Sequence, residues 1–163
     1  MEIKFYGASK IWHAPKWQAI RAQGFNNVAR WIDIEGDSTS EAVYKGKEIT
    51  REDIWNFCLD DVTAADCVIF YCGDSEEEQR GAIMEAGHAI GQGKPVYCIN
   101  HCETVRACGI SDVAFTHHRL WNWVAPNEWL SFEVGFRRAF WKATNDRFLL
   151  NENKLKLAAK RNI

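Results

Sequence analysis

Hydrophobic and polar positions follow one another in blocks of strand and helix along the first hundred residues. Residues 3–8 form a short apolar strand, and a proline opens the helix predicted over 15–23. Two continuous apolar runs, 67–72 and 95–99, are rich in strand formers and predict strands buried on both faces. This order of strand, helix and strand with short joints is typical of a parallel sheet.

The segment between the two buried strands predicts a crossover helix. Ser75 followed by Glu78 fits a capping box at its start, and Gly91 and Gly93 supply its end. Inside this helix Glu85 stands among small and aliphatic residues. A carboxylate in such surroundings loses hydration, so it should be paired, protonated or used in chemistry. Glu85 is therefore the leading candidate for a functional residue.

Two further segments, 27–32 and 112–116, have the composition of strands. With them the chain predicts an α/β protein with a flavodoxin-like three-layer fold and a five-stranded parallel sheet. The stretch 33–47 lacks clear periodicity and is long for a plain connection, which favours a functional or oligomeric loop.

Two more helices complete the predicted fold. Thr50 and Asp53 fit a capping box for a helix that reaches about residue 65. A long helix is predicted from Pro126 or Asn127 to about Leu150. We expect one domain over residues 1–150, followed by a basic tail over 151–163.

Composition narrows the class of protein. Hydrophobic residues make up 47% of the 163 positions, enough for a core, and the formal charge of -2 gives no bulk attraction for nucleic acid. No stretch approaches the ~18 apolar residues of a membrane span, and the start has no signal-peptide pattern. These observations predict a cytoplasmic protein that binds neither membrane nor nucleic acid.

The six cysteines are expected to be reduced, because Cys67, Cys72 and Cys98 lie in predicted buried strands. A zinc site can be drawn from the cysteines and histidine of residues 98–108, but the chain has no Cys-x-x-Cys pair. We therefore predict no metal and no cofactor.

Several motifs together resemble one enzyme family. They are the opening run 3–9, the Ala-Asp-Cys-Val-Ile-Phe-Tyr run 65–71, the Met-Glu-Ala-Gly-His context of 81–89, and the Gly-Lys-Pro-Val-Tyr run 93–97. In this combination the chain resembles the nucleoside 2-deoxyribosyltransferases, including relatives that hydrolyse deoxynucleoside monophosphates. The resemblance covers roughly residues 3–100.

The resemblance implies that Glu85 acts at the anomeric carbon of a nucleoside or nucleotide. Cleavage of an N-glycosidic bond creates positive charge at that carbon, which a carboxylate can stabilise or bond to. A glycosyl-enzyme intermediate is then resolved by a second base, which is transfer, or by water, which is hydrolysis.

In a doubly wound sheet, ligands bind at the carboxyl ends of the strands, here beside the first and third. Small residues let a sugar or phosphate approach the backbone, and amides at a helix start can hold an anion. His88, one turn after Glu85, either orients the carboxylate, meets the base or is a structural histidine. The substrate-binding candidates on these grounds are Gly7, Ala8, Ser9, Gly73, Gly81 and His88.

The chain departs from the family at two acidic positions. The family has an Asp six residues before the glutamate, where this chain has Gln79, which can hydrogen-bond to substrate but cannot act as a general acid. The Asp that holds the sugar hydroxyls is replaced in register by Cys58. Asp61, nearly one helical turn later, is expected to reach the same cleft.

The first strand departs as well. Phe5 stands in register with the phenolic tyrosine of the family, and Tyr6 follows one place later. Because neighbouring side chains of a strand face opposite sides, Tyr6 is predicted not to substitute for that tyrosine.

Two other functions fit the same residues. Toll/interleukin-receptor-like domains place a catalytic glutamate on a comparable helix, and an NAD glycohydrolase would release nicotinamide as a neutral base without an acid at Gln79. Alternatively, the cleft binds a nucleotide without turnover. In each case the partner is a small-molecule nucleoside or nucleotide.

The last third of the chain is rich in indoles, between Trp121 and Trp141. One domain of this size cannot readily bury eight Trp and nine Phe residues, so some should cover an intersubunit surface. We expect a homodimer or a larger even-numbered homo-oligomer. In the resembled transferases a neighbouring subunit completes each site.

Overall fold

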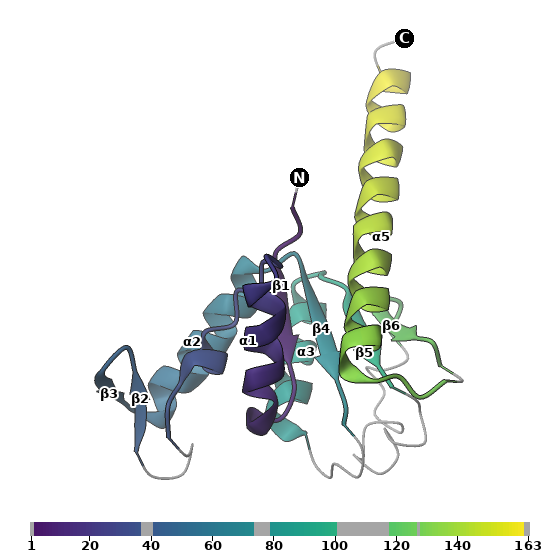
Figure 1. Cartoon of the computed structure of the whole chain (residues 1–163). Helices are drawn as coiled ribbons and strands as arrows, with labels where there is room; N and C mark the ends of the chain where they lie inside the picture. The colour runs from purple at the N-terminus through teal and green to yellow at the C-terminus, as the bar shows by residue number, and fades with distance from the viewer. Residues whose placement is uncertain (1, 37–40, 74–78, 101–117, 127, 162–163) are drawn as a thin grey trace.

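A computed structural model places a four-stranded parallel sheet between two pairs of helices (Figure 1). It describes residues 2–36, 41–73, 79–100, 118–126 and 128–161, with side chains described as far as residue 148. The strand order is β1-β4-β5-β6, and every neighbouring pair is parallel. The strands are β1 (Phe5–Ala8), β4 (Cys67–Tyr71), β5 (Val96–Ile99) and β6 (Trp121–Val124).

Helices α1 and α5 cover one face of the sheet, and α2 and α3 cover the other (Figure 1). On the first face Phe5 packs against Trp17 and Phe136, with ring centroids 6.1 and 5.3 Å away. The next residue, Tyr6, is fully buried and points to the opposite layer, because side chains alternate along a strand. The helices are α1 (Ala14–Ala22), α2 (Arg51–Ala64), α3 (Arg80–Gly91) and α5 (Phe132–Arg161), with short 3-10 turns η1 (Ile11–His13) and η2 (Arg30–Asp33).

The parallel α/β sheet is confirmed, but in the described part of the chain it has four strands rather than the predicted five. Residues 27–32 do not form a strand: Asn27 makes one parallel bridge to Phe5, and the chain then turns into η2. Phe5 still pairs with this segment through its backbone amide and carbonyl, and beyond it side chains take over the pairing at this edge of β1. The Gly7 amide donates to Asn27 Oδ1 at 3.2 Å, and Trp31 Nε1 donates to the Gly7 carbonyl at 2.8 Å. These bonds satisfy the amide and the carbonyl of Gly7 without a neighbouring strand.

Two elements were not predicted. Part of the stretch predicted as an irregular loop forms the antiparallel hairpin of β2 (Ala42–Tyr44) and β3 (Lys47–Ile49). Its turn residues Lys45 and Gly46 both have positive φ, 51° and 75°, as a two-residue hairpin loop requires. The other unpredicted element is β6, while the predicted strand 112–116 lies outside the described residues.

The predicted helices are present with some shifted ends. The capping box of α2 is confirmed, since Thr50 Oγ1 accepts from the Asp53 amide at 3.1 Å. Ser75 and Glu78 lie outside the described residues, and α3 is described from Arg80. The last helix, α5, begins at Phe132 rather than at residue 126 or 127, and it continues past residue 150 to Arg161. None of the helices in the described part of the chain is long and apolar enough to cross a membrane.

Candidate functional site

Glu85 is buried between α3, α2 and the first strand. The Tyr6 hydroxyl donates a 2.7 Å hydrogen bond to Glu85 Oε1. Burial raises the pKa of Glu85 to about 7, and hydrogen bonds from Tyr6 and Cys58 oppose that rise. Phe5 and Tyr6 face opposite sides of the sheet as predicted, but the residue that lies with Glu85 is Tyr6, which was predicted not to take the place of the tyrosine, while Phe5 faces the opposite helix layer. The structure therefore gives Glu85 a phenolic partner.

Cys58 of α2 is also in this cluster. The pKa of its thiol is raised first by burial and then by the charge of Glu85, so the thiol stays neutral. Burial and the charge of Glu85 likewise raise the pKa of Tyr6, so its hydroxyl stays protonated. The cluster of Tyr6, Cys58 and Glu85 therefore holds one group that ionises near neutral pH, and that group is Glu85.

Asp61 lies near this cluster but is held by Arg30. Its Oδ2 accepts from the Arg30 amide and its Oδ1 accepts from Arg30 Nε, both at 2.7 Å. Burial raises the pKa of Asp61, while the bonds from Arg30 lower it. Both carboxylate oxygens of Asp61 thus bond to Arg30, which joins α2 to η2. The charge of Asp61 also raises the pKa of Glu85.

A cavity of about 250 Å³ brings three of the predicted substrate-binding residues together. Ser9 follows the carboxyl end of β1, while Gln79 and Gly81 come from the start of α3. Gln79 is the residue at the N-cap of that helix and is only 2% exposed. Gly81 and Ala82 precede Glu85 by four and three residues, so the cavity lies about one helical turn, ~5.4 Å, from Glu85 along α3.

The cavity has a positive lining. Lys10 comes from the segment after β1, and Arg80 is the first residue of α3. The Lys10 ammonium lies 5.3 Å from the ring centroid of Trp12, whose indole is 61% exposed. Two cations and the amino end of a helix together favour an anionic group in this cavity.

Gly7, Ala8 and Gly73 do not line this cavity. A Cβ on Gly7 would lie 2.7 Å from the Trp17 ring, so packing explains the glycine. Ala8 is fully buried at the end of β1, and Gly73 is buried just after β4. These three residues shape the carboxyl edge of the sheet.

His88 is not directed to the carboxylate of Glu85. Its Nε2 lies 3.3 Å from Thr63 Oγ1 and 2.9 Å from Gln92 Nε2. These contacts join the end of α2 to the end of α3. They fit the structural role that the sequence left open for this histidine.

Three basic residues of the site were missed from the sequence. Arg30 is the one charged side chain in the run 27–32, which was an available signal that it has a buried anionic partner. Lys10 and Arg80 directly follow Ser9 and Gln79, and nothing in the local pattern distinguishes them from surface cations.

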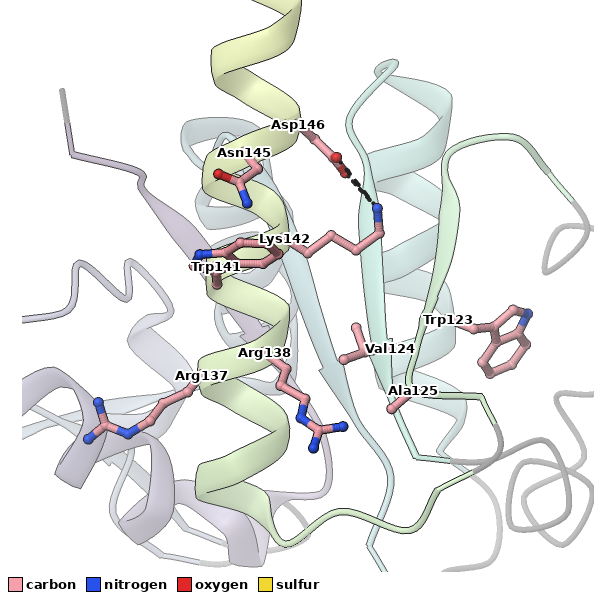
Figure 2. Close-up of a pocket in the computed structure, with 9 residues that line it drawn as sticks. All are labelled: Trp123, Val124, Ala125, Arg137, Arg138, Trp141, Lys142, Asn145 and Asp146. Carbon is pink, nitrogen blue, oxygen red and sulfur yellow. Dashed lines mark hydrogen bonds and ion pairs between the residues drawn. The ribbon is translucent and has the colours of Figure 1, made fainter.

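A second cavity lies elsewhere, between β6 and α5 (Figure 2). Its volume is about 640 Å³, and Trp123 and Trp141 contribute aromatic surface to it. Lys142 and Asp146, which also line it, form an ion pair at 3.1 Å. No predicted site residue lines this second cavity.

A scan against protein-family models gives no match to the chain. Comparisons with curated proteins and with solved structures give no match either.

Proposed function

We propose that the protein cleaves or exchanges the N-glycosidic bond of a nucleoside or nucleotide, with Glu85 acting at the anomeric carbon. The observation that carries this proposal is the buried hydrogen bond from Tyr6 to Glu85. It joins a carboxylate of perturbed pKa to the phenol of the first strand, next to a cavity at the carboxyl edge of a parallel sheet.

In the first step, the ionised Glu85 attacks the anomeric carbon and forms a glycosyl ester. The carbon–nitrogen bond breaks, and its electron pair leaves with the base. In the second step, water or another base attacks the same carbon, and the carboxylate departs with the electrons of the ester bond. When water is the acceptor, its proton goes to the solvent or to the departed base.

The active-site electrostatics support this sequence of steps. A pKa of about 7 keeps roughly half of Glu85 ionised at neutral pH. Positive charge that develops at the sugar favours the ionised form. The Tyr6 hydroxyl and the Cys58 thiol hold the carboxylate in place through hydrogen bonds that favour its ionised form.

Within this substrate class, the cavity beside α3 favours a phosphorylated substrate. Lys10, Arg80 and the first amides of α3 offer a positive setting for a phosphate one helical turn from Glu85. A nucleoside monophosphate places its phosphate about that far from the anomeric carbon.

NAD is a second candidate substrate because Gln79 lines the cavity where the family has an acid. Nicotinamide leaves as a neutral base from a cationic ring and needs no proton donor. The Glu85 carboxylate then acts at the anomeric carbon in the same way, and water is the acceptor.

The flavodoxin-like fold is part of this proposal. If the bridge at Asn27 is counted as the remnant of a strand, the order becomes 2-1-3-4-5, as in flavodoxin. The switch in direction then falls beside β1, whose carboxyl end leads into Ser9 in the lining of the candidate cavity.

The test is product analysis by mass spectrometry after incubation with deoxynucleosides, their monophosphates and NAD. We expect a free base from one substrate class, and Glu85→Gln should lower turnover on the order of 10³-fold or more while ligand binding persists. Met84→Gln is the matched control, because it introduces the same amide at a side chain that is 59% exposed. Near wild-type turnover in Glu85→Gln would remove Glu85 from the reaction, and ligand binding without any product would favour a non-catalytic nucleotide-binding protein.

A further inference from the structure

The outer face of α5 carries three large apolar side chains in a line. Val134, Trp141 and Phe148 are 45%, 70% and 62% exposed, and each follows the previous one by seven residues. Seven residues are two helical turns, so the three lie along one stripe. The opposite side of the helix packs on the sheet through Phe136 and Ala143. α5 is therefore apolar on two opposite sides.

Only the first part of this helix is supported by the rest of the fold. Its 30 residues span ~45 Å. Figure 1 shows the C-terminal half of α5 projecting beyond the sheet. The stripe runs along the half of α5 that packs on the sheet and ends at Phe148, where the projecting half begins. A continuous line of exposed apolar side chains is typical of an interaction surface.

We infer that a second copy of this chain binds the outer face of α5, with the two α5 helices antiparallel and crossing at Trp141. The stripe is symmetric about Trp141, because Val134 and Phe148 lie seven residues before and after it. A two-fold axis at Trp141 therefore pairs Val134 of each copy with Phe148 of the other. Such a contact is closed and self-complementary, as in most homodimers.

Charge favours the antiparallel direction. Arg137 and Arg138 flank the stripe with side chains 54% and 47% accessible, and each forms an ion pair within its own copy, with Glu133 at 3.1 Å and with Glu128 at 2.6 Å. In a parallel pair Arg137, Arg138 and Glu133 would each face the same residue of the second copy, and like charges so placed are destabilising. In the antiparallel pair Arg137 meets Asn145 and Arg138 meets Thr144, which are neutral hydrogen-bonding side chains.

The groove between α5 and β6 extends the surface (Figure 2). The exposed parts of the stripe supply roughly 300 Å² per copy, estimated from the area that aromatic side chains bury. A stable interface needs ~800 Å² per partner. The groove, with Trp123 and Trp141 in its lining and a volume of about 640 Å³, lies beside the crossing point and adds to the stripe.

Sedimentation equilibrium at micromolar concentration tests the interface. We expect wild type at twice the 18.7 kDa chain mass and Trp141→Glu at the monomer mass, with an unchanged circular dichroism spectrum. Trp12→Glu is the matched control and should stay dimeric, because its indole is 61% exposed but lies on η1. A monomeric wild type, or a dimeric Trp141→Glu, would overturn the inference.

Cysteine cross-linking tests the direction, in a background where Cys102 and Cys108 are replaced by Ser. We expect a disulfide-linked dimer when Val134→Cys and Phe148→Cys proteins are mixed and oxidised, and almost none from either protein alone. Efficient cross-linking of Val134→Cys alone would indicate parallel helices and refute the antiparallel arrangement. Absence of cross-links in the mixture would refute the pairing of Val134 with Phe148.

Discussion

The Tyr6 hydroxyl and Glu85 Oε1 lie 2.7 Å apart, although 79 residues separate the two in sequence. The contact connects the first strand to the middle of α3 and is buried. Its effect on Glu85 has a known direction, since the hydrogen bond stabilises the ionised carboxylate and lowers a pKa that burial has raised.

Tyr6→Phe should therefore raise the pKa of Glu85 further. Because the proposed reaction needs the ionised form, we expect turnover at pH 7 to fall about tenfold or more, as for loss of a hydrogen bond to a charged group. The rising limb of the pH–rate profile should move to higher pH. Tyr97→Phe is the matched control: it also removes a strand tyrosine hydroxyl, bonded to Asp146 at 3.0 Å, and should leave the limb in place. An unshifted limb in Tyr6→Phe would separate this hydrogen bond from catalysis.

The pKa of Glu85 also predicts how stability depends on pH. Burial raises it from 4.5 to about 7, so between these values the folded protein keeps a proton that the unfolded chain has lost. The resulting stabilisation is complete below pH 4.5, falls as the pH rises and is lost above pH 7. Between pH 5 and 7.5 the free energy of unfolding should drop by roughly 2 kcal/mol from this group. Urea denaturation of wild type and Glu85→Gln measures it, since the difference between the two proteins should shrink by that amount, and a difference independent of pH would contradict the buried carboxyl.

Asp60 and Asp61 offer a matched pair for testing the anchor of η2. Asp61 accepts two hydrogen bonds from Arg30, and its side chain is 9% exposed, whereas that of Asp60 is 75% exposed. We expect Asp61→Asn to reduce the free energy of unfolding by about 1–3 kcal/mol. Asp60→Asn should change it by less than ~0.5 kcal/mol. Equal effects in urea denaturation would show that the bonds from Arg30 do not stabilise the fold.

The elements that the sequence predicted well depend on local patterns. β4 and β5 are continuous apolar runs, and the start of α2 is fixed by a capping box between Thr50 and Asp53. Segment 27–32 has an equally good strand composition, but its Asn27 and Trp31 side chains bond to Gly7. Composition does not reveal whether a segment pairs through its backbone or through its side chains.

The candidate site was predictable in part for a related reason. Glu85 was found because a carboxylate among small residues is unusual, whatever the fold. The direction of the Tyr6 side chain could not be predicted, since alternation fixes only that Phe5 and Tyr6 face opposite layers. Which layer holds α3 depends on the path of the chain, and Arg30 joins Asp61 through the same long-range geometry.

Gln79→Asp tests the leaving group in the proposed reaction. The position is buried at the start of α3, where burial raises the pKa of an aspartate while Lys10, Arg80 and the amino end of the helix lower it. The fraction of this aspartate that keeps its proton can donate it to a leaving base. For a base that needs protonation, we expect turnover to rise by about 10-fold or more. For NAD, whose nicotinamide leaves neutral, turnover should not rise. Unchanged rates on both substrate types would place Gln79 away from the leaving group.

Gly135→Ala tests how closely α5 approaches the sheet. A Cβ at Gly135 would lie 2.2 Å from Ile99 Cγ2, and Ile99 is fully buried in β5. Helix propensity alone would make the alanine stabilising by ~1 kcal/mol. The clash should outweigh that gain and reduce the free energy of unfolding by about 1–3 kcal/mol, because a packed core resists added volume. Gly87→Ala is the matched control, since it lies inside α3 with no atom within 4 Å of the added Cβ, and it should stabilise the protein by the propensity term. Thermal or urea denaturation compares the two variants, and a stabilised Gly135→Ala would mean that α5 lies farther from β5 than the packing against Ile99 requires.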